Sequence, residues 1–133
     1  MTKVLVTVSQ AKDGSFWCHT EDEVYGGGLN GAGESVKDAK EDLMACLEDA
    51  KADYVDNGNA PYEVEFYYQY DLQSFFDYFS FLNVPEIAKR AGINPSLMRQ
   101  YTRGIKNAGE KTYERLASCM ESITKELQVA SFR

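Results

Sequence analysis

Residues 83–101 read NVPEIAKRAGINPSLMRQY, and this stretch decides the fold of the C-terminal half of the chain. Asn83 can cap a helix, and Pro85 follows at an early helical position, where its missing N–H costs nothing. Gly92 can adopt a positive φ and turn the chain sharply where that helix ends. Asn94 then caps a second helix, which again starts with a proline. The pattern predicts two short helices joined by a tight turn, which is a helix-turn-helix.

Small and apolar residues in this stretch have the spacing of two helices that cross closely. Ala88 leaves room at the crossing, and Ile93 is expected to fill the space beneath the turn. On the second helix, Met98 and Tyr101 lie three residues apart and are expected to point inward. The side chains left facing outward are Ser96, Leu97, Arg99, Gln100 and Arg103.

The spacing resembles the helix-turn-helix of phage-repressor-like (Xre-type) proteins. In that family an alanine, a turn glycine four residues later, a small apolar residue, and a helix that ends in an aromatic residue and Arg-Gly recur. The corresponding positions here are Ala88, Gly92, Ile93, Tyr101 and Arg103-Gly104. The resemblance extends over the helix expected before this stretch and the long helix expected over residues 110–128, and it implies binding to double-stranded DNA.

A recognition helix of this kind lies in the major groove with its N-terminal residues towards the base edges. We therefore expect Ser96, Leu97 and Gln100 to face bases, with Gln100 suited to adenine and Leu97 to a thymine methyl group. The helix N-terminus at Asn83 would add backbone N–H contacts to phosphate. The side chains expected to neutralise phosphates are Arg99, Arg103, Lys106 and Lys111. The alternative is a helix-turn-helix that serves only packing or dimerisation.

Charge is divided unevenly along the 133 residues. The chain has net charge −7, but residues 1–74 hold fifteen acidic and five basic side chains, whereas residues 75–133 hold six acidic and nine basic ones. The two parts therefore carry −10 and +3. This division indicates an acidic half that faces a basic partner and a basic half that can meet phosphate. Uneven surface charge without a functional consequence is the alternative.

Composition excludes several classes of protein. Hydrophobic residues make up 44% and charged residues 26%, which is typical of a globular chain. No apolar run approaches the roughly 18–20 residues of a membrane helix, and the N-terminus lacks the apolar core of a signal peptide. Cys18, Cys46 and Cys119 are odd in number and widely spaced, so we expect free thiols rather than disulfides. A cytoplasmic location without a membrane partner is the expectation.

The N-terminal half has the pattern of a small sheet with one helix. Val4, Val6 and Val8 alternate along a first strand, and Asp13-Gly14 indicates a hairpin turn. Ser35 can cap a helix whose apolar residues follow at helical spacing. The expected elements are strands over residues 4–8 and 16–20, a short strand within residues 26–33, a helix over residues 35–55 and a strand over residues 62–70. The order is therefore β-β-β-α-β, and a further helix is expected from Leu72 onward.

Three motifs in this half are interpreted as structural. The glycines of residues 26–31 satisfy G-x-G-x-x-G, but acidic residues precede them and no P-loop lysine follows, so nucleotide binding is not expected. His19 is the only histidine, so no second histidine is present to complete a metal triad or a histidine-assisted catalytic pair. The acids of a conceivable two-metal site are interpreted as solvated turn residues; they are Asp13, Glu21, Asp22 and Glu23. No catalytic residue, metal or cofactor is expected.

The arrangement of the N-terminal half resembles the HicB antitoxin family. The residues that carry this resemblance are Asp13-Gly14 before an aromatic strand, a glycine-containing loop, and Gly33-Glu34-Ser35 opening a helix that contains Ala39. The resemblance implies a partial RNase H-like domain over residues 1–71 that lacks the catalytic carboxylates and binds a small toxin. It also implies a DNA-binding module over residues 72–133. The fold expected is therefore α+β, with a β-β-β-α-β domain followed by an all-α helix-turn-helix domain.

The resemblance further implies a function for the whole chain. It would be the antitoxin of a type II toxin–antitoxin system, would mask a basic, HicA-like toxin that cleaves mRNA, and would repress its own promoter as a homodimer or higher homo-oligomer. A dimer seam is one interpretation of the last helix, and core packing is the other. One alternative function is a stand-alone transcription regulator whose N-terminal half senses or oligomerises. Another is an Mg²⁺-dependent nucleic-acid hydrolase that uses Asp13 or Glu21.

Overall fold

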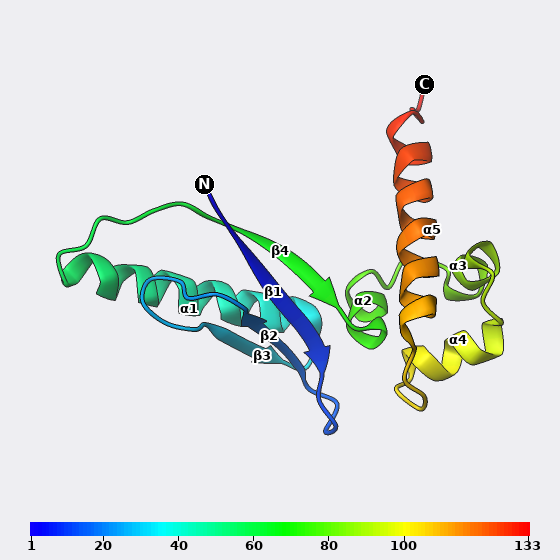
Figure 1. The fold of residues 1–133 in the computed structure, drawn as a ribbon, viewed down its shortest axis with the longest axis horizontal. Helices are drawn as coiled ribbons and strands as arrows, with labels where there is room; N and C mark the ends of the chain where they lie inside the picture. The colour runs from blue at the N-terminus through cyan, green and yellow to red at the C-terminus, as the bar shows by residue number, and fades with distance from the viewer. The chain divides into compact units, whose positions relative to one another are not determined.

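The computed structural model describes residues 1–133 and contains a four-stranded mixed sheet and five helices (Figure 1). The expected combination of strands and helices is therefore confirmed. The chain divides into two units, unit 1 (Met1–Tyr78) and unit 2 (Phe79–Arg133). No helix has both the length and the apolar character needed to cross a membrane.

The sheet of unit 1 has the strand order β3-β2-β1-β4, in which β1 and β4 are parallel and the other neighbours antiparallel. Its strands are β1 (Thr2–Gln10), β2 (Phe16–Thr20), β3 (Asn30–Gly33) and β4 (Val64–Tyr70). The helix α1 (Val36–Asp56) leads from β3 to β4 and packs against β2 and β3. These elements agree with the expected β-β-β-α-β order, and β3 is the short strand expected within residues 26–33.

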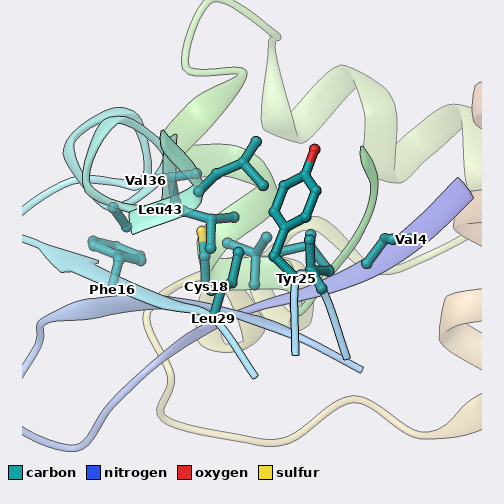
Figure 2. Close-up of a cluster of buried hydrophobic side chains, with 12 residues drawn as sticks. Val4, Phe16, Cys18, Tyr25, Leu29, Val36 and Leu43 are labelled. Carbon is teal, nitrogen blue, oxygen red and sulfur yellow. The ribbon is translucent and has the colours of Figure 1, made fainter. Parts of the chain in front are cut away.

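The core of unit 1 lies between α1 and one face of the sheet. Strand alternation buries Val4, Val6 and Val8 on this face, and Cys18 of β2 lies beside them. Helical spacing brings the apolar side of α1 onto the same cluster, where Leu43 is fully buried (Figure 2). Burying one such side chain contributes about 1.5–3 kcal/mol, so this cluster holds the helix on the sheet.

Two glycines allow β3 to approach α1 closely. A Cβ atom at Gly31 would lie 2.3 Å from the carbonyl oxygen of Ala39 and 2.5 Å from the backbone nitrogen of Leu43. A Cβ atom at Gly33 would lie 2.5 Å from the Cβ of Asp38. The glycines at these two positions therefore have a packing role, because backbone atoms of a helix cannot move aside as flexible side chains do.

The helix α2 (Leu72–Tyr78) belongs to unit 1, where it contacts β1, β4 and α1. Asp71 anchors its start, since its carboxylate accepts hydrogen bonds from the Gln10 and Ser74 backbone N–H groups at 2.9 and 2.8 Å. Asp77 near its end accepts from the Val36 N–H at 2.9 Å and so caps α1 together with Ser35. These bonds hold α2 to unit 1, which ends at Tyr78, whereas the sequence-based division came after residue 71.

Unit 2 consists of the helices α3 (Val84–Ala91), α4 (Pro95–Thr102) and α5 (Glu110–Gln128). The Asn83 side chain caps α3 by accepting from the Glu86 N–H at 3.2 Å, as the sequence predicts. Gly92 ends α3 with φ of +76°, a left-handed conformation that favours glycine. The Ile93 N–H then donates to the Ala88 carbonyl at 2.8 Å, which closes the turn into α4.

A second, smaller core holds these three helices together. Its members are Ile87, Ala88, Ile93, Met98, Leu116 and Cys119, all of them buried. Leu116 and Cys119 bring the N-terminal half of α5 onto α3, so this half of the last helix has the core packing that was one of its two interpretations. Leu127, in contrast, is 67% exposed, and the C-terminal turns of α5 extend beyond α3 and α4 (Figure 1).

Candidate nucleic-acid interface

The helix α4 has a buried side and an exposed, basic side. Met98 is 0% exposed and anchors the helix to the core of unit 2, and Tyr101 is half-buried. Ser96, Arg99, Gln100 and Arg103 follow the spacing i, i+3, i+4 and i+7, which places them together on another side of the helix. Among them, Gln100 is half-buried and the other three are exposed; Leu97 beside them is half-buried.

The N-termini of α3 and α4 are capped by their own asparagine side chains. The Oδ1 atom of Asn94 accepts from the backbone N–H groups of Ser96 and Leu97 at 2.8 and 3.3 Å. The Asn83 Oδ1 atom likewise accepts from the Glu86 N–H at 3.2 Å. These donors already have partners, so contacts from the start of α4 would come from side chains and not from these amides. At the N-terminus of α3, the Glu86 N–H is likewise already bonded to Asn83, so this amide is not available to phosphate.

The loop after α4 brings another cation to the end of that helix. The Arg103 N–H donates to the Arg99 carbonyl at 3.1 Å and closes α4, and Gly104 follows with φ of +74°. The N–H of Lys106 then donates to the Gln100 carbonyl at 3.3 Å, which folds the loop back onto the last turn. Lys106 therefore lies beside α4, and Lys111 is exposed in the first turn of α5.

Cations around α4 differ in their partners from three other cations of unit 2. Lys89 and Lys125 each lie 3.3 Å from a glutamate oxygen, and Arg90 forms an ion pair with Glu126. No carboxylate lies within 4.0 Å of the cations expected to meet phosphate, which are Arg99, Arg103, Lys106 and Lys111. Residues 91–109 contain no aspartate or glutamate, so the segment that holds Arg99, Arg103 and Lys106 carries only positive charge.

Two further arginines near this surface were not identified from the sequence. Arg90 of α3 and Arg115 of α5 line a cavity of about 700 Å³, together with Lys111. Arg115 Nη1 donates to the Gly92 carbonyl at 3.2 Å and so fixes α5 to the turn. In the sequence, Lys111 and Arg115 are four residues apart, and this spacing could have indicated that the two side chains share one face of the last helix. Only tertiary packing brings Arg90 to the same cavity.

The acids considered for a metal site in unit 1 have local partners instead. Asp13 lies in the turn between β1 and β2, where its carboxylate accepts from the Ser15 hydroxyl at 2.6 Å and from the Ser15 N–H at 2.9 Å. These hydrogen bonds lower the pKa of Asp13. Glu21 follows β2 and contacts His19 at 3.1 Å and the Thr7 hydroxyl. No cluster of three or more histidine, cysteine or acidic side chains has the geometry of a metal site.

Unit 1 leaves negative charge uncompensated on the outer side of α1. Four acids of this helix are exposed: Glu41, Asp42, Glu48 and Asp49. Asp42 accepts a hydrogen bond from the Ala32 N–H at 2.9 Å, and no acid of α1 forms an ion pair. Unit 1 holds sixteen acidic and five basic side chains, or −11, whereas unit 2 holds five acidic and nine basic ones, or +4.

Comparison with known proteins identifies no relative: no family model matches the chain, and neither a curated protein nor a solved structure matches it. The function therefore has to be inferred from the geometry and charge of the chain itself.

Proposed function

We propose that the chain is a DNA-binding antitoxin of a type II toxin–antitoxin system, similar to the HicB family. In this proposal unit 2 is a helix-turn-helix module that binds the promoter of its own operon. Unit 1 is a partial RNase H-like domain that masks a small, basic, HicA-like toxin. The chain acts by binding both partners and performs no catalytic step.

The observation that carries the DNA-binding proposal is the exposed side of α4. Arg99 and Arg103 lie there without a carboxylate partner, and Met98 on the buried side holds the helix in place. Recognition helices read base edges with one side while cations beside them bind phosphate. Gln100 lies between the two arginines in this arrangement and can bond to the major-groove edge of adenine.

Two features of unit 1 support the antitoxin proposal. Its β-β-β-α-β order is the one that the resemblance to the HicB family implies, and its excess of acidic side chains gives it a net charge of −11. The uncompensated acids of α1 are complementary to a protein that must bind RNA phosphates. A toxin covered by this surface would lose access to RNA without any chemistry by the antitoxin, and complementary charge would also speed the encounter.

DNA binding is tested with the full chain and a duplex taken from upstream of its own gene. We expect the double variant Arg99→Ala/Gln100→Ala to bind at least tenfold more weakly, because it loses one phosphate contact and one base contact. Lys125→Ala is the matched control, since Lys125 is an exposed cation of α5 that is already paired with Glu121. Equal affinity of the double variant and the control would contradict this part of the proposal.

The proposal predicts that a small basic protein is encoded beside this chain, and toxin masking is tested with that protein. We expect a stable complex that blocks RNA cleavage in a purified assay. The variant Glu41→Gln/Glu48→Gln/Asp49→Asn should associate at least tenfold more slowly at low salt, because complementary charge acts mainly on the association rate. Since these residues are exposed, the variant should keep its fold. Unchanged association, or cleavage that continues in the complex, would contradict the masking proposal.

A further inference from the structure

A cavity of about 380 Å³ lies between α1 and α2 within unit 1. Lys37, Lys40, Glu41 and Met44 line it from α1, where their spacing of i, i+3, i+4 and i+7 places them on one side of the helix. Tyr78 lines it from α2. The volume lies within the range of pockets that hold small molecules in proteins, which is about 300–1,000 Å³.

Lys40 carries a charge at the wall of this cavity that no anion of the protein neutralises. Its Nζ atom lies 3.5 Å from the centre of the Tyr78 ring and 3.9 Å from that of Tyr68, and it donates to the Tyr70 hydroxyl at 2.6 Å. These neutral groups replace part of the water around the ammonium group. No carboxylate lies within 4.0 Å of Lys40, and burial lowers the pKa of its amine.

A partly buried cation without a counter-ion is unfavourable, and an anion bound in the cavity would relieve that cost. The lining contains two lysines and one glutamate, so its net charge of +1 suits an anion with a single charge. A doubly charged phosphate would meet repulsion from Glu41. The charge of the lining therefore favours a carboxylate.

The other walls of the cavity are apolar and partly open to solvent. Met44 of α1 is 43% exposed and Tyr78 of α2 is 39% exposed, so a ligand can reach both side chains from solvent. A thioether and a phenol ring offer a surface on which an aromatic ring can pack. A ligand with a carboxylate at one end and an apolar body at the other would satisfy both parts of the lining.

We propose that this cavity binds a small aromatic monocarboxylic acid, whose carboxylate contacts Lys40 and Lys37 and whose ring packs against Met44 and Tyr78. The cavity shares Glu41 with the toxin surface proposed above, but the proposal does not depend on binding of either toxin or DNA. It lies entirely in unit 1, and Tyr78 is the last residue before unit 2 begins.

The test is calorimetric titration of the full-length protein with phenylacetate as the probe. Two matched compounds separate the contributions: 2-phenylethanol has the ring without the charge, and acetate has the charge without the ring. We expect saturable binding of phenylacetate with one molecule per chain. Both comparison compounds should bind at least tenfold more weakly, since each lacks one of the two contacts.

Variants connect this binding to the cavity. Lys40→Met and Met44→Glu should each weaken phenylacetate binding at least tenfold, the first by removing the cation and the second by adding a repelling carboxylate. Lys125→Met, which changes an exposed lysine of unit 2, should leave binding unchanged. Because Met44 is exposed, Met44→Glu decides the question if Lys40→Met fails to fold. Absence of saturable binding, or binding that survives Met44→Glu, would overturn the proposal.

Discussion

Unit 1 and unit 2 carry opposite charge, and each has a helix region whose exposed charged side chains form no ion pair. On α1 of unit 1 the exposed acids form no ion pair, and around α4 of unit 2 the exposed cations form none. Elsewhere in unit 2, lysines and an arginine are paired with glutamates. Within unit 2, some cations are therefore neutralised while those around α4 are not, and we infer that the latter belong to a binding surface.

The two units also differ in how their cores are built. Unit 1 buries one extensive cluster between a sheet and α1, whereas unit 2 packs three helices around a few side chains. A unit of about 55 residues buries a smaller fraction of its surface than a larger one and is correspondingly less stable. Unit 2 is therefore expected to unfold more easily than unit 1.

Truncating one core side chain in each unit should give the largest effects. Leu43→Ala and Met98→Ala each remove a fully buried side chain, and each should lower the stability of its own unit by about 2–5 kcal/mol. Hydrogen exchange resolved by residue separates the two responses. Loss of protection confined to residues 1–78 for the first variant and to residues 79–133 for the second is expected. Equal loss in both units for either variant would show that the units unfold as one.

A substitution at Gly31 should destabilise unit 1 next most strongly. Gly31→Ala places a methyl group against the backbone of α1, and the resulting shift should cost about 1–3 kcal/mol. Gly28→Ala is the matched control, because a Cβ atom there meets nothing within 4 Å. Fluorescence of Trp17, the only tryptophan, reports urea unfolding of unit 1. A similar midpoint for both variants would argue against close packing of β3 on α1.

The boundary between the units can be tested through Asp77. Asp77→Ala removes the carboxylate that accepts from the first N–H of α1, and it should lower the stability of unit 1 by about 1 kcal/mol. Glu48→Ala, which changes an exposed acid of α1, should alter stability by less than about 0.5 kcal/mol. If Asp77→Ala changed only the unfolding of unit 2, α2 would belong with that unit.

Alkaline pH should weaken unit 1 through its buried acidic groups. Burial raises the pKa of Cys18 above its ordinary value of 9.0, and burial also raises the pKa of Tyr68 and Tyr70. The folded state therefore keeps these protons after the unfolded state has lost them, so their stabilising contribution is present below pH 9 and is lost as pH rises further. Lys40, whose pKa is lowered, acts in the opposite direction.

Urea midpoints followed by Trp17 fluorescence at pH 8 and pH 10 measure this effect. The midpoint of wild-type unit 1 should be lower at pH 10, and Cys18→Ala should reduce the difference between the two pH values. A midpoint that rises with pH would show that Lys40 dominates.

Local sequence signals predicted most of the fold. Alternation along residues 62–70, the helical spacing after Ser35, and the asparagine caps at Asn83 and Asn94 agree with the structure because each depends on neighbours in sequence. The position of α2 could not be predicted in this way. Its grouping with unit 1 depends on hydrogen bonds that Asp71 and Asp77 accept from backbone N–H groups far away in the chain.

The candidate site shows the same limit. The exposed side of α4 follows from helical spacing, so Arg99 and Arg103 could be placed from the sequence. The cavity lined by Arg90 and Arg115 depends on how α3 packs against α5, and the aromatic surroundings of Lys40 depend on how β4 and α2 meet α1. Such arrangements combine residues from distant segments, and no local pattern signals them.

We propose that the unpaired cations of α4 bind DNA phosphate. The salt dependence of binding tests it most directly, measured with the full chain and its own upstream duplex. Each phosphate contact contributes about −0.9 to the slope of log K against log[salt]. We predict a steep slope for the wild-type chain, a slope less steep by about one unit for Arg99→Ala and for Arg103→Ala, and no change for Lys125→Ala. A wild-type affinity independent of salt, or equal slopes for all four proteins, would contradict the account.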